Sequence, residues 1–598
     1  MTPWIITRSH GSTRGEGRKK RLGIVLVVLF FFAFYCVFGL AGFNPTDDGF
    51  VLGQSWRLLQ GQVPFRDFTS PRPIGSAYVH LLEFMPSSSL LAWSRLVVLG
   101  QLVLIAFLLV SILRITKTMS VFLLPLFTVL AFCINVNSFP LMAWHTIDGL
   151  FFASIAVWFC IQGLPNLSPR INYSVAFFFA GVAPLMKQGF LIVPAVVAVI
   201  CIVKKDRTFL RLAPLASIAP LLFAIYFLIR AGATTLLSQL ATSSPANAEL
   251  FLARKGPLGF VPFALESVLS KDGLIIIGLA WTGAVLVSFS RSYSLQLFGA
   301  SLCVVPLVVL IVQQRAASVG SWSYLTFGVL AIVALYLART QTDWIFLIAL
   351  GGLAIAVSVS WGIPTPSLVA GSAYVGIAHL IVNAIAVKDH ERKTINEYTA
   401  VVLLSVLAVL SVLSSRSVNI YEQGALNQLR SSVANHQLAG IRMQEGTAQY
   451  LSTVDRCLKE FPAKRVAIIP DGPGLYPLFG IKNPFPFDWW WPWERVASSP
   501  RQLRAAQSEM NSGGDWLVLV QTYVLVRKDA GQRYGIEPAS PELEPGSFYW
   551  SGTPDFVDEG TGVASYYVPG DAGIVAGLKG KSITCGPFVG KYSPASQR

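Results

Sequence analysis

Long apolar runs recur through the first 414 residues of this chain. Many approach the roughly 20 residues that a helix needs to cross a bilayer. Only 13% of the 598 residues are charged, far fewer than in a soluble protein of this size. We therefore predict a polytopic α-helical membrane protein with about 13 transmembrane helices. The apolar runs cover residues 22–42, 91–113, 119–136, 143–162, 172–186, 188–203, 209–229, 273–290, 294–312, 321–338, 343–361, 367–387 and 398–414.

Positively charged residues indicate the orientation of these helices. The net charge is +15, but the cations fall mainly between the apolar runs, where they set topology and contact anionic lipids rather than nucleic acid. The basic segment 1–21 precedes an apolar run longer than that of a signal peptide, which places the N-terminus in the cytoplasm. Alternate loops then carry the cations, as the positive-inside rule requires. We predict a multi-pass protein of the inner (plasma) membrane, with a transmembrane domain at 22–414, outer loops at 43–90 and 230–258, and an extracytoplasmic domain at 415–598.

Two adjacent acidic residues, Asp47 and Asp48, lie where the first apolar run leaves the membrane, in the stretch 44–50. Ionisable groups at such a position are costly or face solvent, which makes them candidates for function. The simpler alternative is that Thr46 or Asp47 caps the next helix and that both acids lie in water. Residues 50–59 have the spacing of a short amphipathic helix, which we expect to lie along the outer membrane interface.

Further polar residues occur in the predicted outer loops. Prolines exclude regular helix after residue 63, so Arg66, Asp67 and Arg72 form a rigid loop beside the two acids. Arg66 and Asp67 either form a local ion pair or contact substrate. Arg254 and Lys255 oppose the charge bias of the outer side, and they bind either lipid headgroups or an anionic substrate.

The stretch 172–203 is predicted to form a hairpin of two short spans, because one long span would reverse the sidedness of every later basic cluster. The tip of the hairpin, Lys187 and Gln188, should then lie below the outer surface. Lys187 either extends to the headgroups or faces a water-filled cavity where it meets an anion. His145 begins another span, and it is either a hydrogen-bonded structural residue or a functional one.

From about residue 415 the composition becomes that of a globular domain. Predicted helices alternate with strands at 466–469 and 516–526, which favours a small α/β domain. Cys457 and Cys585 lie together in an oxidising compartment, where they can form a disulfide that spacing alone does not prove.

Together these features resemble the GT-C superfamily of membrane glycosyltransferases, the group that includes protein O-mannosyltransferases and lipid A aminoarabinose transferases. The likeness covers about the first 210 residues and part of the tail, and no single motif is specific. Many members have Asp-Glu where this chain has Asp47-Asp48, which leaves the identity of the catalytic base open. The matching pieces are Asp47-Asp48-Gly49, the loop GQVPFRDFTSPRP at 61–73, Lys187-Gln188, Pro470-Asp471-Gly472-Pro473-Gly474 and Asn483-Pro484.

The resemblance implies a polyprenyl-phosphate-linked sugar donor, used on the outer face, and an aspartate general base. A positioned carboxylate contributes about 10²–10⁴-fold to such a reaction, and we favour Asp47 because it aligns with the first acid of the family motif. The acceptor is a hydroxyl of a glycan, lipid or protein, and one displacement inverts the anomeric centre. The leaving phosphate needs cations, which Lys187 (beside Gln188), Arg254 or Lys255 can supply. No cofactor is required, although Mg²⁺ or Mn²⁺ between the aspartates suits their oxygen ligands.

Two other classes of protein compete with this interpretation. A transporter or flippase of lipid-linked saccharide would use Asp47, Asp48 and Lys187 as a substrate or proton path. Transporters often have internal repeats, none of which is recognised here, and the acids lie in a loop rather than within a span. A non-catalytic cell-envelope assembly protein would bind glycan or partner proteins through its tail. The sequence identifies neither the sugar, nor the acceptor, nor the polyprenyl length.

Overall fold

The structure, a computed structural model, describes residues 25–44, 47–113, 123–240, 260–313, 321–359, 366–385, 390–417, 425–469, 472–488, 505, 516–521, 574–578, 582–585 and 588–591. Within these ranges every predicted apolar run carries helix. Seven of the described helices are long and apolar enough to cross a membrane, and six shorter apolar helices accompany them. The chain is therefore an integral membrane protein built mostly of helices.

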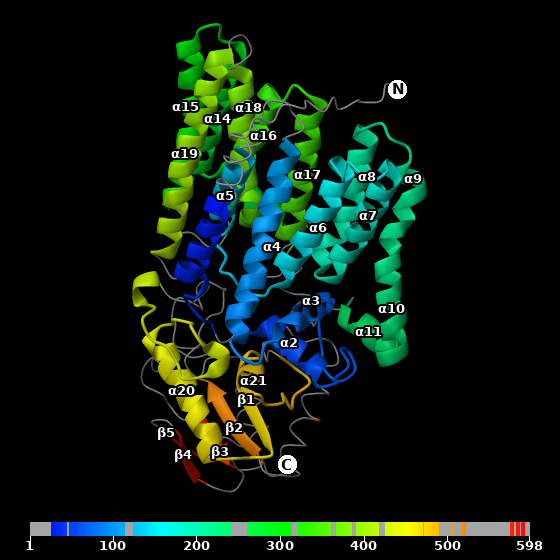
Figure 1. The fold of residues 1–598 in the computed structure, drawn as a ribbon, viewed down its shortest axis with the longest axis vertical. Helices are drawn as coiled ribbons and strands as arrows, with labels where there is room; N and C mark the ends of the chain where they lie inside the picture. Colours follow the sequence, from blue (N-terminus) through cyan, green and yellow to red (C-terminus); the bar gives the residue numbers. More distant parts are fainter. Residues whose placement is uncertain are drawn as a thin grey trace.

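The helices pack into a bundle in which consecutive helices mostly lie side by side and run in alternate directions (Figure 1). The first helix, Val25–Gly39, ends in a π-helical turn, η1 (Tyr35–Gly39). The other long or apolar helices are α4 (Leu90–Ile112), α5 (Leu123–Asn135), α6 (His145–Ile161), α7 (Pro169–Val182), α8 (Val193–Val203), α10 (Ile218–Ala231), α13 (Phe260–Leu269), α14 (Lys271–Phe289), α15 (Tyr293–Gln313), α16 (Ser321–Leu337), α17 (Gln341–Ser358), α18 (Ala370–Ile385) and α19 (His390–Arg416). Short connecting helices are α2 (Phe50–Leu59), α3 (Gly75–Val79), η2 (His80–Phe84), η4 (Ala183–Leu185), η5 (Gln188–Ile192), α9 (Phe209–Leu212), η6 (Ala213–Ser217), α11 (Ala233–Leu240) and η9 (Pro366–Val369).

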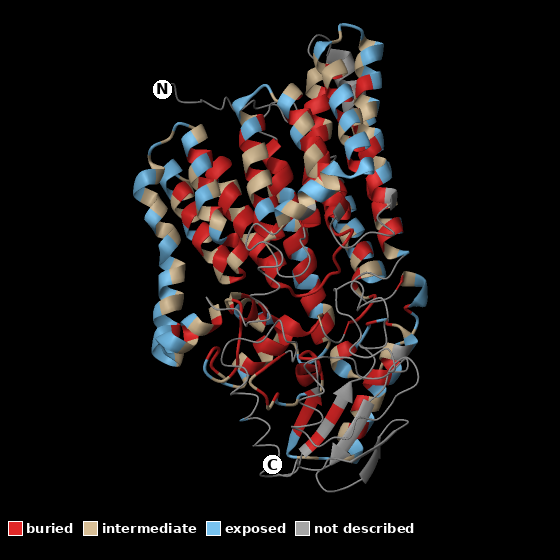
Figure 2. Ribbon diagram, turned by 180° about the vertical axis from the view of Figure 1, so that it is seen from behind, coloured by how far each residue is buried: buried red, intermediate tan, exposed pale blue. Residues whose placement is uncertain are grey.

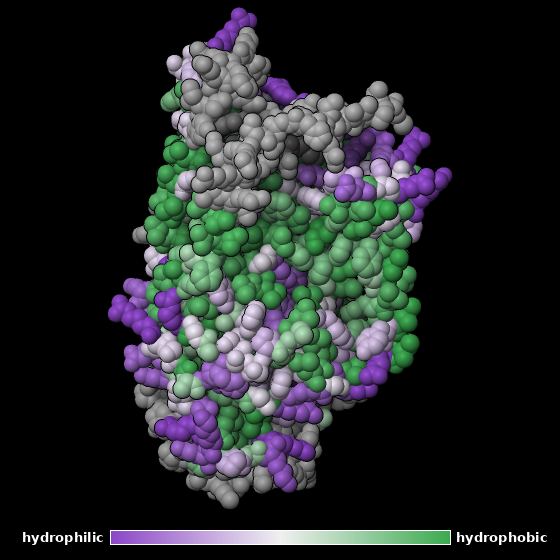
Figure 3. Space-filling view, viewed as in Figure 1, coloured by the Kyte–Doolittle hydropathy of each residue, from purple (hydrophilic) through white to green (hydrophobic). Residues whose placement is uncertain are grey.

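Hydrophobic side chains form a belt around the middle of the bundle, with hydrophilic residues gathered above and below it (Figure 3). Burial differs greatly between helices. In Leu90–Ile112, which is α4, 61% of the most apolar window is buried inside the protein, against only 6% in Phe209–Ala231, which contains α10. Because an apolar helix without protein neighbours is stable only in lipid, we infer that α10 lies at the margin of the bundle.

The turns after α8, after α14 and before α17 lie together at one end of the bundle. Gln341, at the start of α17, donates a hydrogen bond to the carbonyl of Val203, at the end of α8. The Arg339 guanidinium donates to Ser288 Oγ at 2.9 Å, which joins the α16–α17 turn to the end of α14. The alternating loop charges predict that these turns share one side of the membrane, and which side that is stays a prediction.

The described residues after α19 form a small α/β unit at one end of the bundle, which we call the tail (Figure 1). One sheet has the order β1-β2-β3, with β1 parallel to β2 and β3 antiparallel to β2, and β4 pairs antiparallel with β5 in a second sheet. The observed β1 and β2 correspond to the predicted strands, and residues 522–526 of the second prediction lie outside the described part of the chain. The tail elements are η10 (Leu426–Gln428), η11 (His436–Leu438), α20 (Glu445–Glu460), β1 (Arg465–Ile469), α21 (Leu475–Leu478), β2 (Trp516–Gln521), β3 (Ile574–Leu578), β4 (Ser582–Cys585) and β5 (Phe588–Lys591).

The cysteines differ between the bundle and the tail. Cys457, on α20, is disulfide-bonded, whereas five cysteines of the bundle are free. The predicted partner, Cys585, ends β4, and its side chain is not among those described.

Helix α2 has the predicted bounds but not the predicted environment. We expect from its pattern a helix lying on the membrane interface with one polar face, yet seven of its ten residues are buried. Buried residues continue from the bundle through this region toward the tail (Figure 2). The polar face of α2 is covered because residues 473–488 of the tail pack against it, a long-range contact that helical periodicity does not reveal.

Candidate functional site

The acidic turn between the first helix and α2 holds its two carboxylates differently. Asp48 is fully buried. Its Oδ2 accepts a hydrogen bond from the Asn44 N–H at 2.9 Å and forms an ion pair with Arg95 Nη2 at 3.0 Å. Asp47 is partly exposed, and its carbonyl accepts from the N–H of Phe50, the first residue of α2, at 3.2 Å. Asp48 is thus committed to an ion pair, and Asp47 is the more accessible acid.

Arg95 on α4 fixes this turn against the end of the first helix. Its guanidinium also donates to the carbonyls of Gly39, at 2.9 Å, and Gly42, at 2.5 Å. A planar guanidinium suits such a fixed set of acceptors because its donors form a rigid fork. Sequence reasoning missed Arg95, although a charged residue inside a predicted span is a signal of function or of a buried partner.

The hairpin tip carries a buried cation. Lys187 is 4% exposed, and its Nζ donates to Thr146 Oγ1 at 3.0 Å, the one hydrogen bond of this ammonium to a described residue. Gln188 beside it donates to the carbonyl of Pro71 at 2.7 Å. The tip therefore packs against the loop at 61–73. The sequence predicts that both lie on the same side of the membrane.

Arg72 adds a second cation to the same region. It is 7% exposed, and its guanidinium lies 5.6 Å from the centre of the Phe50 ring, at the start of α2. Burial, followed by the nearby Arg72 charge, lowers the pKa of Lys187 from 10.5 to about 7; Lys187 lies in the turn between the two short helices, outside both. Burial of a charge without a counter-charge is strongly unfavourable, and the described hydrogen bond of Lys187 is to a neutral hydroxyl, so this ammonium should attract an anion.

Aromatic rings line this cationic pair. Trp144 lies 6.1 Å from Phe50 and 4.5 Å from the His145 ring, measured between ring centres. His145 is 5% exposed, and the charges of both Arg72 and Lys187 act on it. The structure thus brings three predicted site residues together, and it joins them through Phe50 to the acidic turn.

Other predicted site residues lie elsewhere. Arg66 and Asp67 form a local ion pair, with Nε and Oδ1 2.8 Å apart. The hydrogen bond from Arg66 lowers the pKa of Asp67, whose Oδ2 also accepts from the Val63 N–H at 2.7 Å. The structure therefore shows the local ion pair, one of the two roles predicted for Arg66 and Asp67. Contact of either residue with substrate stays a prediction. Arg254 and Lys255 lie outside the described residues.

A buried polar network that the sequence did not predict lies beside the site. His80 Nε2 lies 3.1 Å from Asp148 Oδ1, which also accepts from Gln101 Nε2 at 2.7 Å, and His80 Nδ1 contacts Glu83. Burial lowers the pKa of His80, but the two carboxylates together raise it well above 6.5. An imidazolium that donates to both acids ties η2 to α4 and α6. Among the described residues no group of three or more His, Cys, Asp or Glu side chains could hold a metal ion, and the Mg²⁺ or Mn²⁺ option stays a prediction.

Comparison with known proteins gives one kind of match. No protein-family model and no curated protein matches the sequence. The chain is similar in structure to ArnT. The apo form of ArnT from Cupriavidus metallidurans matches 88% of this chain and 96% of its own at 12% identity and a TM-score of 0.43. ArnT from the same organism bound to undecaprenyl phosphate matches 86% and 94% at 13% identity and the same TM-score.

Proposed function

We propose that this protein is an integral-membrane glycosyltransferase of the GT-C type. It transfers a sugar from a polyprenyl-phosphate donor to a hydroxyl of a glycan, lipid or protein, on the extracytoplasmic face and with inversion. The observation that carries this proposal is the buried cationic pair, Lys187 and Arg72, beside an acidic turn. A lipid-linked phosphate supplies the anion that Lys187 otherwise lacks, because no carboxylate of a described residue forms an ion pair with this ammonium.

Asp47 is the proposed general base. Asp48 is fully buried and ion-paired with Arg95 at 3.0 Å, so its carboxylate orients the turn. The partly exposed Asp47 takes the proton of the acceptor hydroxyl as the hydroxyl oxygen attacks the anomeric carbon. The bond from that carbon to the phosphate oxygen then breaks, and polyprenyl phosphate leaves with the bonding electrons.

Lys187 and Arg72 stabilise the leaving phosphate. A phosphate monoester gains negative charge as it departs, and cations fixed in a site sheltered from water stabilise that charge far better than cations in bulk water. Gln188 holds the hairpin tip against the loop that carries Arg72, which keeps the two cations at a constant separation.

The extracytoplasmic sidedness is supported by the distribution of charge. Lys204, Lys205 and Arg207 follow α8, and Arg339 precedes α17, at the end of the bundle away from the tail. The positive-inside rule assigns that end to the cytoplasm, so the acidic turn and the cationic pair face the other side.

The test begins with cells that lack the protein, in which the lipid-linked sugar should accumulate and be identified by mass spectrometry. The purified protein should consume that lipid and release polyprenyl phosphate. Asp47→Asn should lower the rate by about 10²–10⁴-fold and leave affinity for undecaprenyl phosphate unchanged. A transporter or an assembly protein would leave the lipid-linked sugar intact in this assay, and an Asp47→Asn protein as fast as the parent would refute the base.

A further inference from the structure

The tail touches the helix that follows the acidic turn, backbone against backbone. A Cβ placed on Gly49 would lie 2.1 Å from Gly474 Cα, and one placed on Gly474 would lie 2.5 Å from Gly49 Cα. A Cβ on Gly53 would lie 2.7 Å from the carbonyl oxygen of Pro473. Only glycine allows two backbones to approach so closely, and the first turn of α2 therefore has the tail as its immediate neighbour.

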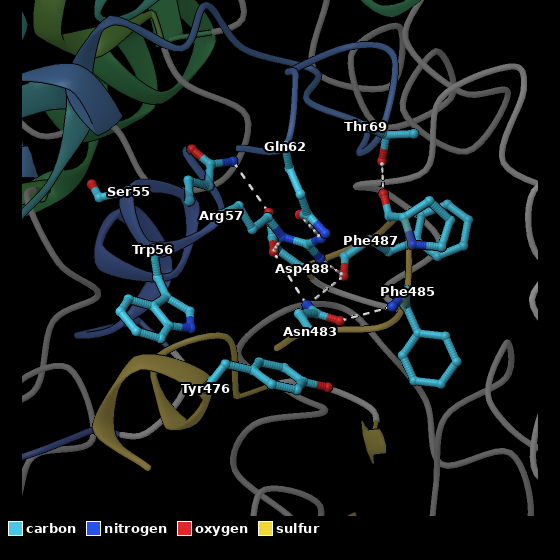
Figure 4. Close-up of polar contacts among 12 residues, drawn as sticks. Ser55, Trp56, Arg57, Gln62, Thr69, Tyr476, Asn483, Phe485, Phe487 and Asp488 are labelled. Atoms are coloured by element: carbon cyan, nitrogen blue, oxygen red, sulfur yellow. Dashed lines mark hydrogen bonds and ion pairs between the residues drawn. The ribbon is translucent and has the colours of Figure 1, made fainter. Parts of the chain in front are cut away.

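An ion pair continues this contact along the same face of α2. Gly49, Gly53 and Arg57 recur every four residues, so they form one stripe on the helix. Arg57 Nε donates to Asp488 Oδ1 at 2.7 Å, and the two side chains are 1% and 3% exposed. Arg57 Nη2 also donates to the carbonyl of Phe487 at 2.7 Å (Figure 4).

The tail segment 472–488 is held at several points besides this pair. The Trp56 indole N–H donates to the carbonyl of Ile481 at 2.7 Å. The Asn483 side chain donates to the Phe487 carbonyl at 3.1 Å and accepts from the Phe485 N–H at 3.0 Å, which fixes the bend before Asp488 (Figure 4). Hydrogen bonds within the segment and to α2 thus both hold it in place.

A buried ion pair is a poor source of net stability, because desolvation of both groups offsets their attraction. Its main effect is geometric, since a guanidinium that binds a carboxylate and a carbonyl together admits few orientations. Glycine packing sets the distance between α2 and the tail, and Arg57 sets the register.

We propose that Arg57 and Asp488 are a positioning pair for the transfer reaction. They hold segment 472–488 against the stripe on α2 and thereby fix the turn at residues 47–49, which carries the base. Lys187 lies on a different element, and its described hydrogen bond is to Thr146 rather than to segment 472–488. This inference rests on the proposed function, and neither residue of the pair touches substrate.

Two variants of the full-length protein test the proposal by different routes. Arg57→Gln removes the ion pair, and Gly474→Ala adds a methyl group against Gly49 at a backbone conformation (φ −68°) that alanine adopts freely. Both should lower kcat for the accumulated lipid-linked sugar by about 100-fold, the effect of a small misplacement of a catalytic group. The KM for that lipid should not change. Arg57→Lys, which keeps the charge, should recover part of the rate.

Matched controls and a second readout separate positioning from general damage. Lys459→Gln breaks an exposed ion pair of the tail, and Gly100→Ala adds a methyl group where no atom lies within 4 Å; both should retain the parent rate. Amide hydrogen exchange should rise at 47–53 and at 472–488 together in the test variants, and in neither control.

The outcomes are distinguishable. Loss of protection at 472–488 alone, or a parent rate in a variant that loses protection at both segments, would overturn the positioning role. A KM that rises in step with the fall in kcat/KM would overturn it as well. If the parent protein consumes no lipid-linked sugar while both segments lose protection together, the proposed function fails and the coupling of the two segments stands.

Discussion

Replacing Lys187 by methionine tests whether this buried ammonium serves an anion or the fold. Methionine fills a similar volume without the charge. A pKa moved from 10.5 to about 7 corresponds to about 5 kcal/mol of unfavourable free energy for the charged form. The folded, unliganded protein carries this penalty in full below about pH 7, where both folded and unfolded states are protonated. The penalty is relieved as the pH rises from about 7 to 10.5, so stability should rise over that range and Lys187→Met should abolish the rise.

The affinity of the protein for an anionic lipid should fall as the pH rises, opposite to the change in stability. A hydrogen bond between an ammonium and a phosphate contributes about 1.5–3 kcal/mol, which corresponds to a loss of about 10–150-fold in affinity. We therefore expect Lys187→Met to bind undecaprenyl phosphate that much more weakly at about pH 6. The difference from the parent protein should shrink at about pH 9, where the parent Lys187 has lost its proton in the unliganded state.

The measurements are thermal unfolding in detergent over this pH range and titration with undecaprenyl phosphate. Lys204→Met is the matched control, because Lys204 lies at the far end of α8 and its Nζ donates to the Cys160 carbonyl at 2.8 Å. It should leave lipid affinity unchanged. If Lys187→Met instead unfolds more easily than the parent and binds the lipid equally well, the ammonium is structural and the argument for an anion site is wrong.

Two further predictions follow from the acidic turn and the hairpin. Arg95→Met leaves the Asp48 carboxylate buried without its ion pair, which should lower the free energy of unfolding by about 3–5 kcal/mol; thermal unfolding measures this, and a loss no larger than that from breaking an exposed ion pair on α20 would contradict it. In a Cys36→Ser background, Gln188→Cys should react with a membrane-impermeant thiol reagent added from outside. Arg66→Cys, in the exposed loop, is the positive control, and a labelled Arg66→Cys beside an unlabelled Gln188→Cys would argue against the placement of the hairpin.

The helices of the bundle could be predicted because each one corresponds to an apolar run in its own stretch of sequence. An apolar run of sufficient length has few alternatives to helix in lipid, where every backbone polar group must be satisfied within the segment. The charge bias at the loops then decided that 172–203 holds two helices, and the structure has a turn at Lys187 between η4 and η5. The bounds of α2 followed from its periodicity in the same way.

The partners of charged side chains could not be predicted, because they are set by packing between distant segments. Arg57 and Asp488 are 431 residues apart, and nothing local to either one indicates the other. Arg95 lies 47 residues from Asp48, so the different environments of Asp47 and Asp48 could not be predicted from the sequence. Pattern alone marked His145 as a candidate but gave no sign of His80, which the fold inserts beside Asp148.

The contact between Gly49 and Gly474 also has a consequence for biosynthesis. The ribosome makes α2 early and its covering loop more than 400 residues later, after the last spanning helix has emerged. A chain that stops short of residue 472 would contain all of the membrane helices yet leave the acidic turn uncovered. We therefore expect truncated products to be inactive in the proposed transfer reaction whatever their level of insertion, because segment 472–488 must fold back onto the first loop before the turn is held in place.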